Sequence, residues 1–444
     1  MTGRYKAYPE YKESGVDWLH DIPEHWKTMP VGRCYHRVKR TGYEAEELLS
    51  VYRDYGVVPK SSRDDNNNKP SDDLSPYQLV CENNLVMNKM KAWQGSIAIS
   101  AYRGIVSPAY FVYEPFNHTE SIVYPKYVHY LLRHPIYITQ YMSRSKGIRV
   151  NQWDLDPESF QSIELLLPLK EEQQKIINFL DHETAKIDTL ITKQEKLIEL
   201  LKEKRQAVIS HAVTKGLNPD APMKDSGVEW LGEVPEHWDV GSLNHFLSAI
   251  GDVDHYMPTS IEKGVPYVMT GDLTELASGI VFEDCKQVNH SDYLKLSKRI
   301  KTSQGDVIMA RYATIGTASY VDIDKDFLVS YSCVTIKPST NRAIGLYLFY
   351  YFKSQAFLQG LQSHINTNTQ GNVGVSDLKK VKITLPNLDE QKLIIEHLQS
   401  LIDKFDDLSE KSLATIELMK ERKKALISAA VTGKIDIRDW QGEA

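Results

Sequence analysis

Three residues in the second half of the chain have the types and spacing of a metal-dependent nuclease site. Asp272, Asp284 and Lys286 follow the pattern D-x11-D-x-K, and such nucleases gather carboxylates and a lysine around Mg²⁺. Chance matches to so short a pattern are common, and Gly271 stands where a proline normally precedes the first acid. A Mg²⁺-dependent nuclease remains an alternative reading.

Other catalytic patterns are missing from the sequence. His25 and His237 have no nearby Cys, His or Asp partner that makes a metal site or a triad convincing. The four cysteines form no CxxC pair, so we expect free thiols and no zinc. There is no GxxxxGK[ST] loop, no GxGxxG unit, and no DPPY-like or NPPF-like tetrapeptide of amino-methyltransferases. The chain is therefore expected to have no catalytic residues and no cofactor of its own.

Basic side chains gather in one segment of the first half. Residues 85–150 hold eight Lys or Arg against two acids, a local charge of +6 in a chain whose formal charge is −6. Such segregation suits phosphate binding, and Arg, Lys, Asn and Gln are the residues that read base edges. The stretch 143–153 reads as a loop. The candidate DNA contacts here are Lys89, Lys91, Trp93, Arg103, Arg144, Lys146, Arg149 and Gln152.

The second half uses different side chains for the same purpose. HINTNTQGNVG (364–374) is rich in amides and hydroxyls and nearly uncharged, and cations lie around it. Taken alone, a basic run is usually a solvated face and such a polar run a mobile loop. The candidate DNA contacts are Lys298, Arg299, Arg311, Tyr312, Asn366, Asn368 and Gln370.

An internal repeat determines where these residues must lie. VDWLHDIPEHWKT (16–28) returns as VEWLGEVPEHWDV (228–240), and LPLKEEQQKIINFL from Leu167 returns as LPNLDEQKLIIEHL from Leu385. A repeat of this length means two copies of one architecture. The tryptophans of the phrase are expected to pack a domain edge. Residues 84–100 and 305–321 each predict a β-hairpin with a charged turn, with Gly95 matching Gly316.

Each copy ends in a long helical block with a coiled-coil period. Apolar residues recur every seven positions, with a polar residue in the middle of each seam, as expected for a paired helix whose register is fixed. Pro168 and Pro386 precede the blocks, and Gly216 and Gly433 follow them. We expect the two helices to pair antiparallel as a spacer. The predicted seam residues are Leu180, Ile187, Gln194, Leu201, Val208, Leu398, Phe405, Ser412, Met419 and Leu426.

The sequence thus predicts an α+β protein made of a tandem duplication. The expected parts are recognition domain 1 (1–166), a central helical spacer (167–216), recognition domain 2 (217–384), a distal helical spacer (385–433) and a C-terminal tail (434–444). No run approaches the roughly 18 apolar residues of a membrane span, and no signal peptide is apparent. We therefore expect the chain in the cytoplasm.

These motifs together resemble the specificity (S) subunits of type I restriction-modification enzymes. The resemblance rests on the duplicated tryptophan phrase, on Glu172-Gln173 and Glu390-Gln391 after the two prolines, and on the helix ends AVISHAVT and ALISAAVT. It covers essentially the whole chain, and the tandem combination is specific.

The resemblance implies a non-catalytic subunit with two target recognition domains held apart by an antiparallel coiled coil. Each domain would read one half of a split, asymmetric target in double-stranded DNA. The implied partners are two methyltransferase (modification) subunits that use S-adenosylmethionine, and two motor-nuclease (restriction) subunits that use ATP and Mg²⁺. The family's base-reading residues vary, so no named contact carries over. The rival from another class is a coiled-coil scaffold whose end domains bind proteins.

Overall fold

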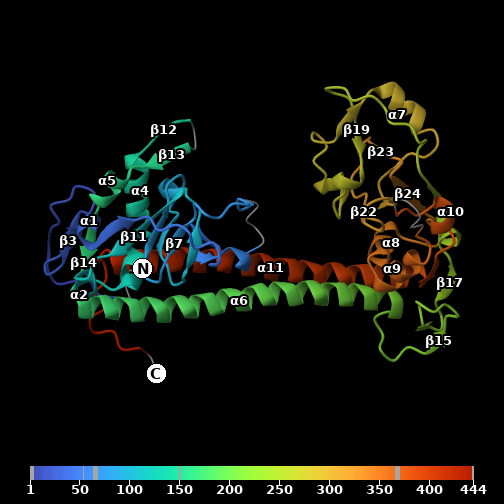
Figure 1. The fold of residues 1–444 in the computed structure, drawn as a ribbon. Coiled ribbons are helices and arrows are strands. Elements are labelled where there is room, and N and C mark those ends of the chain that lie inside the picture. Colours follow the sequence, from blue (N-terminus) through green and yellow to red (C-terminus); the bar gives the residue numbers. More distant parts are fainter. Residues whose placement is uncertain (1–4, 54, 64–68, 150–151, 366–370, 443–444) are drawn as a thin grey trace. The chain divides into compact units, whose positions relative to one another are not determined.

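The computed structural model describes residues 5–53, 55–63, 69–149, 152–365 and 371–442. The chain forms two compact units (Figure 1): unit 1 comprises Met1–Lys193 with Ala414–Ala444, and unit 2 comprises Gln194–Leu413. Each unit therefore contains one predicted recognition domain and a part of both predicted spacer helices.

The two predicted spacers are long continuous helices. Helix α6 spans Lys170–Lys215 and helix α11 spans Leu388–Val431. They begin after Pro168 and Pro386, as expected. The glycines that follow them have φ of 78° at Gly216 and 71° at Gly433, the left-handed conformation that ends helices. A Cβ at Gly433 would also come within 2.5 Å of Pro23, so glycine is needed there for space as well.

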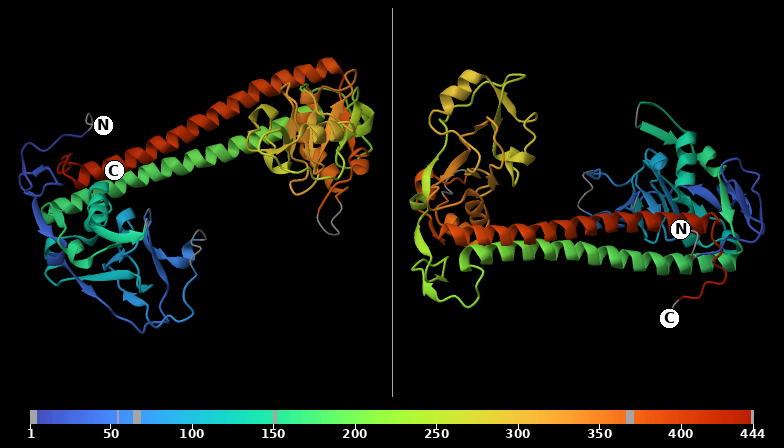
Figure 2. Two further views of the ribbon diagram at one scale, coloured as in Figure 1. Left: turned by 90° about the horizontal axis from the view of Figure 1, so that it is seen from above. Right: turned by 180° about the vertical axis from the view of Figure 1, so that it is seen from behind.

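Helices α6 and α11 run side by side and antiparallel within each unit (Figures 1 and 2). In unit 1, Lys423 Nζ lies 2.6 Å from Asp188 Oδ1. In unit 2, Arg205 Nε lies 3.8 Å from Asp406 Oδ1. Both members of the second pair are the repeat counterparts of the first, so the same interhelical contact is built twice.

All ten predicted seam residues are buried or half-buried. Six of its residues are buried, namely Leu180, Ile187, Leu201, Leu398, Ser412 and Leu426. The other four are half-buried, namely Gln194, Val208, Phe405 and Met419. Burial of this stripe supplies the pairing energy, at roughly 25 cal/mol for each Å² of apolar surface removed from water.

The first predicted domain, domain 1, is built on a four-stranded antiparallel sheet of order β4-β11-β8-β9. The strands span Tyr35–Val38 (β4), Tyr110–Pro115 (β11), Leu85–Asn88 (β8) and Ile97–Ile99 (β9). Helices α3 (Pro125–Leu132) and α4 (Pro135–Arg144) contribute buried residues to its core. Strands β8 and β9 form the predicted hairpin, with Gly95 at φ 95°.

The second predicted domain, domain 2, repeats this sheet as β18-β24-β21-β22. The strands span Leu247–Gly251 (β18), Cys333–Pro338 (β24), Val307–Ala310 (β21) and Ala318–Tyr320 (β22). Helices α8 (Gly345–Phe352) and α9 (Gln355–Gln362) take the places of α3 and α4. The second predicted hairpin, β21 with β22, is also confirmed.

The two domains differ in what is added to the common sheet. Domain 1 carries the pairs β5 (Leu49–Tyr52) with β6 (Gly56–Pro59), β7 (Gln78–Val80) with β10 (Gly104–Val106), and β12 (Ser145–Arg149) with β13 (Gln152–Leu155). Domain 2 carries the sheet β20-β19-β23 (Lys286–Val288, Val265–Val268, Leu328–Val329) and helix α7 (His290–Leu296). These additions explain why the sequence repeat is weakest here.

The duplicated tryptophan phrase joins each domain to its helices. In unit 1 its residues 24–26 connect β2 (Asp21–Pro23) to β3 (Lys27–Pro30), and β3 pairs with β14 (Glu164–Leu167), which leads into α6. The register places Lys27 opposite Leu167, so Trp26 lies over the first turn of α6. Trp26 is buried and its Nε1 donates to Glu172 Oε1 at 3.1 Å, while His25 Nε2 bonds Glu172 Oε2 at 2.7 Å.

Unit 2 repeats this junction at the start of α11. Residues 236–238 of the phrase connect β16 (Glu233–Pro235) to β17 (Asp239–Ser242), and β17 pairs with β25 (Lys382–Leu385). Trp238 Nε1 donates to Glu390 Oε1 at 3.2 Å, and His237 Nε2 bonds Glu390 Oε2 at 2.8 Å. The expectation that these tryptophans pack a domain edge is confirmed.

The glutamines beside these glutamates, which also occur in both copies of the repeat, bind the backbone just before the next helix. Gln173 Oε1 accepts from the backbone N–H of Tyr124, which precedes α3, at 3.0 Å. Gln391 Oε1 accepts from Ile344, which precedes α8, at 2.9 Å. Each Glu-Gln pair therefore fixes two parts of its domain on one helix start.

The last two findings concern the helices of the described residues and the four cysteines. None of its helices is both long enough and apolar enough to cross a membrane. Cys34, Cys81, Cys285 and Cys333 are free thiols, as expected.

Candidate nucleic-acid interface

In domain 1 the hairpin tip between β8 and β9 meets the β12–β13 pair. The backbone N–H of Leu155 donates to Lys89 O at 3.2 Å, the rings of Trp93 and Trp153 lie 5.0 Å apart, and Lys89 Nζ lies 3.4 Å from Asp154 Oδ2. The two predicted stretches therefore meet at the tip through residues 89–93 of the first and through Trp153 and the two residues that follow it. Aromatic rings beside cations are what stacking on nucleic acid requires.

The predicted contacts of domain 1 differ in how available they are. Lys91 and Lys146 are exposed, whereas Lys89 and Trp93 are half-buried. Arg144 is half-buried and donates to Gln140 Oε1. Arg149 and Gln152 are opposed in the β12–β13 register, but their side chains lie outside the described part of the structure.

Arg103 is not brought to this tip. It follows β9 and precedes β10, so it lies at the end of the hairpin away from the turn, where Asn83 N donates to Ser100 O. Its guanidinium donates to Glu46 Oε1 at 2.8 Å. The prediction that Arg103 belongs with the tip is wrong because strand β9 separates Arg103 from the turn of the hairpin.

In domain 2 the tip between β21 and β22 meets the end of the amide-rich segment. Val373 N donates to Arg311 O at 3.1 Å, and Tyr312 forms an antiparallel bridge with Asn372. The predicted face of 305–316 with 364–374 is thus brought together at residues 311–312 and 372–373. Asn366, Asn368 and Gln370 lie outside the described residues.

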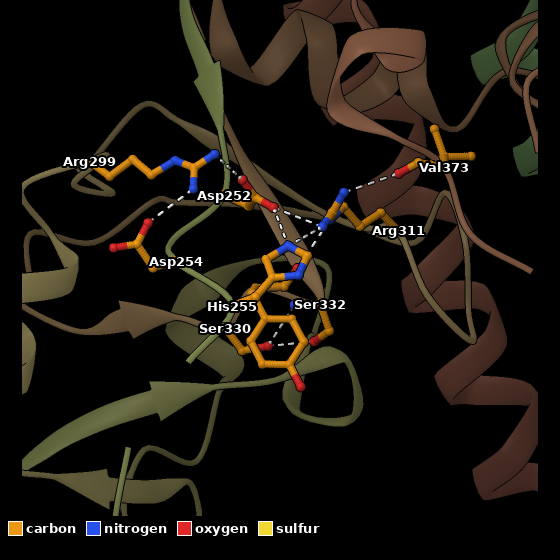
Figure 3. A network of polar contacts seen from close by, with 9 residues as sticks. Asp252, Asp254, His255, Arg299, Arg311, Ser330, Ser332 and Val373 are labelled. Carbon is orange, nitrogen blue, oxygen red and sulfur yellow. Dashed lines mark hydrogen bonds and ion pairs between the residues drawn. The ribbon is translucent and has the colours of Figure 1, made fainter. Parts of the chain in front are cut away.

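A network of charged groups occupies this edge (Figure 3). Asp252 Oδ2 lies 2.7 Å from Arg311 Nη2, and Asp252 Oδ1 lies 3.1 Å from Arg299 Nη2. His255 Nε2 lies 3.1 Å from Asp252 Oδ2 and 3.0 Å from Arg311 Nη2. Arg299 Nη1 reaches Asp254 Oδ1 at 3.1 Å. Two predicted contacts, Arg299 and Arg311, therefore share one carboxylate.

Arg311 does not have the exposure of a phosphate contact. Its side chain is 7% exposed, and it also donates to Tyr331 O at 3.1 Å and Val373 O at 3.4 Å. Its donors are used inside the domain, so its place favours a structural role. Lys298 and Arg299 are exposed, and Tyr312 is half-buried under the Arg311 guanidinium.

The acidic partner of this network was missed in the sequence. Asp252, Asp254 and His255 follow β18, and no motif marks them. Strand pairing shows why these residues belong to the tip. Strands β18 and β21 are both antiparallel to β24, so both end beside the start of β24. Residues directly after β18 are therefore placed at the tip by strand order.

The metal-dependent nuclease alternative finds no support in the geometry. Asp272 Oδ2 accepts from the backbone N–H of Met269 at 2.8 Å, a local capping contact. Cys285 lies close to Asp272 and Asp284, and burial raises the pKa of its thiol to about 11. Within the described residues, no group of three or more His, Cys, Asp or Glu side chains could hold a metal ion.

Comparison with known proteins gives one consistent result. Residues 237–418 match the family described as the type I restriction modification DNA specificity domain. The chain is 25% identical to the type I restriction enzyme MjaVIII specificity subunit of Methanocaldococcus jannaschii, over 97% of this chain and 98% of that protein. It is 22% identical to the type I restriction enzyme EcoKI specificity subunit of Escherichia coli, over 95% of this chain and 91% of that protein.

Solved structures share the fold at low identity. The HsdS subunit from Thermoanaerobacter tengcongensis superposes with a TM-score of 0.55 at 16% identity, covering 93% of this chain and 98% of that chain. A chain from a study of complex assembly and conformational transition of the type I R-M system gives 0.64 at 15% identity, covering 92% and 98%. The family match over residues 237–418, the relatives that align over nearly the whole chain and the shared fold all show that this chain is similar to the specificity subunits of type I restriction enzymes.

Proposed function

We propose that the chain binds a bipartite, asymmetric DNA target with a fixed gap and directs methylation and restriction by partner subunits. Unit 1 reads one half of the target and unit 2 reads the other. The partners are two methyltransferase subunits and two motor-nuclease subunits, which supply the S-adenosylmethionine, ATP and Mg²⁺ chemistry. The chain binds its DNA target in the cytoplasm.

One observation carries this proposal: both units build the same sheet edge and equip it with different side chains. The hairpin tip and the segment before the next helix meet through equivalent backbone contacts, Leu155 to Lys89 and Val373 to Arg311. In domain 1 the edge carries lysines and a tryptophan pair, and in domain 2 it carries an arginine–aspartate–histidine network. Equivalent positions with different donors and acceptors suit two different base sequences.

The helices support the fixed gap. Helix α6 has 46 residues and α11 has 44, and at about 1.5 Å per residue each is roughly 65–70 Å long. Both helices enter both units, and the seam fixes their register. Half-site spacing in DNA-binding proteins follows from the geometry that joins the two readers.

Mapping methylated bases in a genome that carries this gene and its partners tests the proposal. We expect one two-part motif with a constant gap and two unrelated halves. A contiguous motif, or a gap that varies from site to site, would contradict it. No methylation in cells with a competent methyltransferase partner would favour the protein scaffold instead.

A further inference from the structure

The residues that follow β18 complete the recognition edge of domain 2. Gly251 is opposite Thr335 in β24, and Ala310 at the end of β21 is opposite Cys333. The chain therefore leaves β18 at the same end of the sheet where it leaves β21 for the hairpin tip. Three segments meet here: residues 252–256, the tip after Ala310, and residues 371–374.

Asp252 is the centre of this meeting point. Its side chain is 4% exposed, and a buried carboxylate must be paired because desolvation otherwise makes its charge costly. Arg311, Arg299 and His255 all contact it, at 2.7, 3.1 and 3.1 Å. These three side chains come from three different segments of the domain, so one carboxylate sets their relative positions.

The partners of Asp252 divide into one buried and two exposed groups. Arg311 holds the tip to the segment at Val373 and is closed to solvent. His255 is 56% exposed and Arg299 is 53% exposed. Asp252 contacts both of these exposed side chains (Figure 3).

The ring of His255 is unusually well fixed for an exposed side chain. It stacks on Tyr331 with ring centroids 5.0 Å apart and planes 28° apart. Its Nε2 faces Asp252 and Arg311, and its Nδ1 has no protein partner within the described residues. A fixed ring with an available nitrogen can donate to or accept from a base edge.

Arg299 keeps the edge compatible with DNA. Asp252 and Asp254 would repel phosphates, and the Arg299 guanidinium pairs with both. Losing this cation exposes two carboxylates to the DNA backbone. That loss weakens binding to every sequence alike, because phosphate electrostatics carry no base information.

We propose that His255 is a specificity-determining residue for the half-site of unit 2, that Arg299 supplies sequence-independent affinity, and that Asp252 is the positioning residue that holds both. This inference rests on the proposed function and names the side chains of one reader. It also assigns Arg311 to the support of the edge instead of to phosphate contact.

The test uses the full-length chain in complex with its methyltransferase partner. Binding is measured for the mapped target and for targets with one base pair changed in either half, over a series of salt concentrations. The variants are His255→Ala, Arg299→Ala and Asp252→Asn. Lys382→Ala is the matched control, because Lys382 is an exposed cation on β25, next to the start of α11.

Each variant has a distinct expected signature. His255→Ala should lower discrimination at one or two positions of a single half-site by about tenfold or more, with the other half and the salt dependence unchanged. Arg299→Ala should weaken mapped and altered targets equally and reduce the slope of log K against log salt by about one. Lys382→Ala should change neither quantity.

Asp252→Asn distinguishes positioning from mere stability. Asp252→Asn should lower discrimination in one half-site and also reduce the salt slope. In the double variant with His255→Ala, discrimination should be no lower than in His255→Ala alone. If Asp252→Asn fails to fold, the two variants of exposed residues still decide the matter. Unchanged discrimination in folded His255→Ala overturns the assignment of His255, and an unchanged salt slope in Arg299→Ala overturns that of Arg299.

Failure of this inference is separable from failure of the proposed function. A wild-type complex without a two-part target would refute the function. A wild-type complex with such a target, whose unit 2 half-site is indifferent to both exposed variants, would refute only the inference drawn from this edge.

Discussion

Two glutamates, Glu172 and Glu390, anchor the duplicated tryptophan phrase at the residue scale. Both accept a bond from a tryptophan Nε1 and both pair with a histidine. Glu172 also accepts from Tyr8 Oη at 2.5 Å, and it is 4% exposed where Glu390 is 25% exposed. Burial and this bond raise the pKa of Tyr8 far above its usual range.

Replacing these glutamates should therefore have unequal costs. Glu172→Ala leaves buried indole and phenol donors without an acceptor, and we expect it to lower the free energy of unfolding by about 3 kcal/mol. Glu390→Ala should cost roughly 1–2 kcal/mol, because water can reach its site. Urea unfolding followed by tryptophan fluorescence measures both, and equal losses would show that burial does not govern this contact.

His134 replaces a backbone hydrogen bond that Pro135 cannot make. In unit 2, Ser210 Oγ on α6 accepts from the backbone N–H of Gln355 at 3.0 Å. The corresponding residue of unit 1 is Pro135, which has no N–H. The His134 ring bonds Ser428 of α11 instead, through Nε2 at 2.7 Å, and its Nδ1 caps α4 by accepting from Ile136 N at 3.1 Å.

This histidine should make unit 1 sensitive to acid. Burial, with a smaller effect of Lys434, lowers the pKa of His134 to about 4, whereas an unfolded histidine titrates near 6.5. The unfolded chain therefore binds more protons between these values, so stability is full above pH about 6.5 and is lost as the pH falls toward about 4.

The substitution His134→Ser copies Ser354, the cap of α9 in unit 2, and should remove this part of the pH dependence. The expected effect is about 2 kcal/mol less loss of stability between pH 7 and pH 5, measured by urea unfolding. His290→Ser, at an exposed histidine, is the control and should leave the profile as it is. An unaltered profile in His134→Ser would contradict the prediction.

At the scale of elements, the helix pair is governed by its register. The seam residues and the repeated ion pairs, Lys423 with Asp188 and Arg205 with Asp406, select the same antiparallel alignment in both units. A second cluster ties domain 2 to α6. Burial opposes ionisation of Glu275, but bonds from Arg205 and Lys353 lower its pKa to about 2.

Lengthening both helices by one heptad should lengthen the gap of the target. Seven residues inserted after Gln194 in α6 and seven after Ser412 in α11 keep the seam in phase, so both units should fold as before. Methylation mapping should return the same letters in both halves with a longer gap. Altered letters, or an unaltered gap, would show that the helices are not the spacer.

An insertion of five residues in each helix is the matched control for this experiment. It adds length but breaks the period of seven, so the apolar stripe rotates away from the partner helix. We expect reduced stability and loss of a defined gap. If both insertions gave the same stability and the same gap, the register of the seam would not determine the spacing of the two half-sites.

At the scale of the whole molecule, the two units should read DNA separately. Lys91→Glu and Lys146→Glu reverse two exposed charges at the tip of unit 1. We expect weaker binding and a smaller salt dependence, with the half-site letters of unit 2 unchanged. Equilibrium binding at several salt concentrations measures this, and a protein scaffold would be indifferent to both changes.

The chain by itself should not cut DNA. Incubation of the purified chain with Mg²⁺ and plasmid is expected to give no cleavage, and Asp284→Ala should leave DNA binding as it is. Cleavage that disappears in Asp284→Ala would restore the nuclease alternative.

Much of the architecture was predictable from the sequence because it depends on local patterns. Heptad spacing, flanking prolines and glycines gave both long helices, and the apolar runs around Gly95 and Gly316 gave both hairpins. The repeat gave the number of domains. These features follow from side-chain periodicity and backbone preference, which neighbouring residues determine.

The recognition edges depend on contacts that no local pattern records. The sequence pointed to Lys89, Lys91, Arg299 and Tyr312 as candidates, but it grouped Arg103 with a tip from which strand β9 separates it. It also offered Arg311 as a surface cation, although the fold buries it against Asp252.

Sequence alone determined the duplicated plan and the paired helices, since repeats and periodicity are written along the chain. Only the tertiary structure decided which charged side chains are paired inside the domain and which are exposed where DNA could reach them. The physical reason is that a guanidinium becomes structural when a buried carboxylate meets it. Strand order, not sequence distance, brings Asp252 to Arg311.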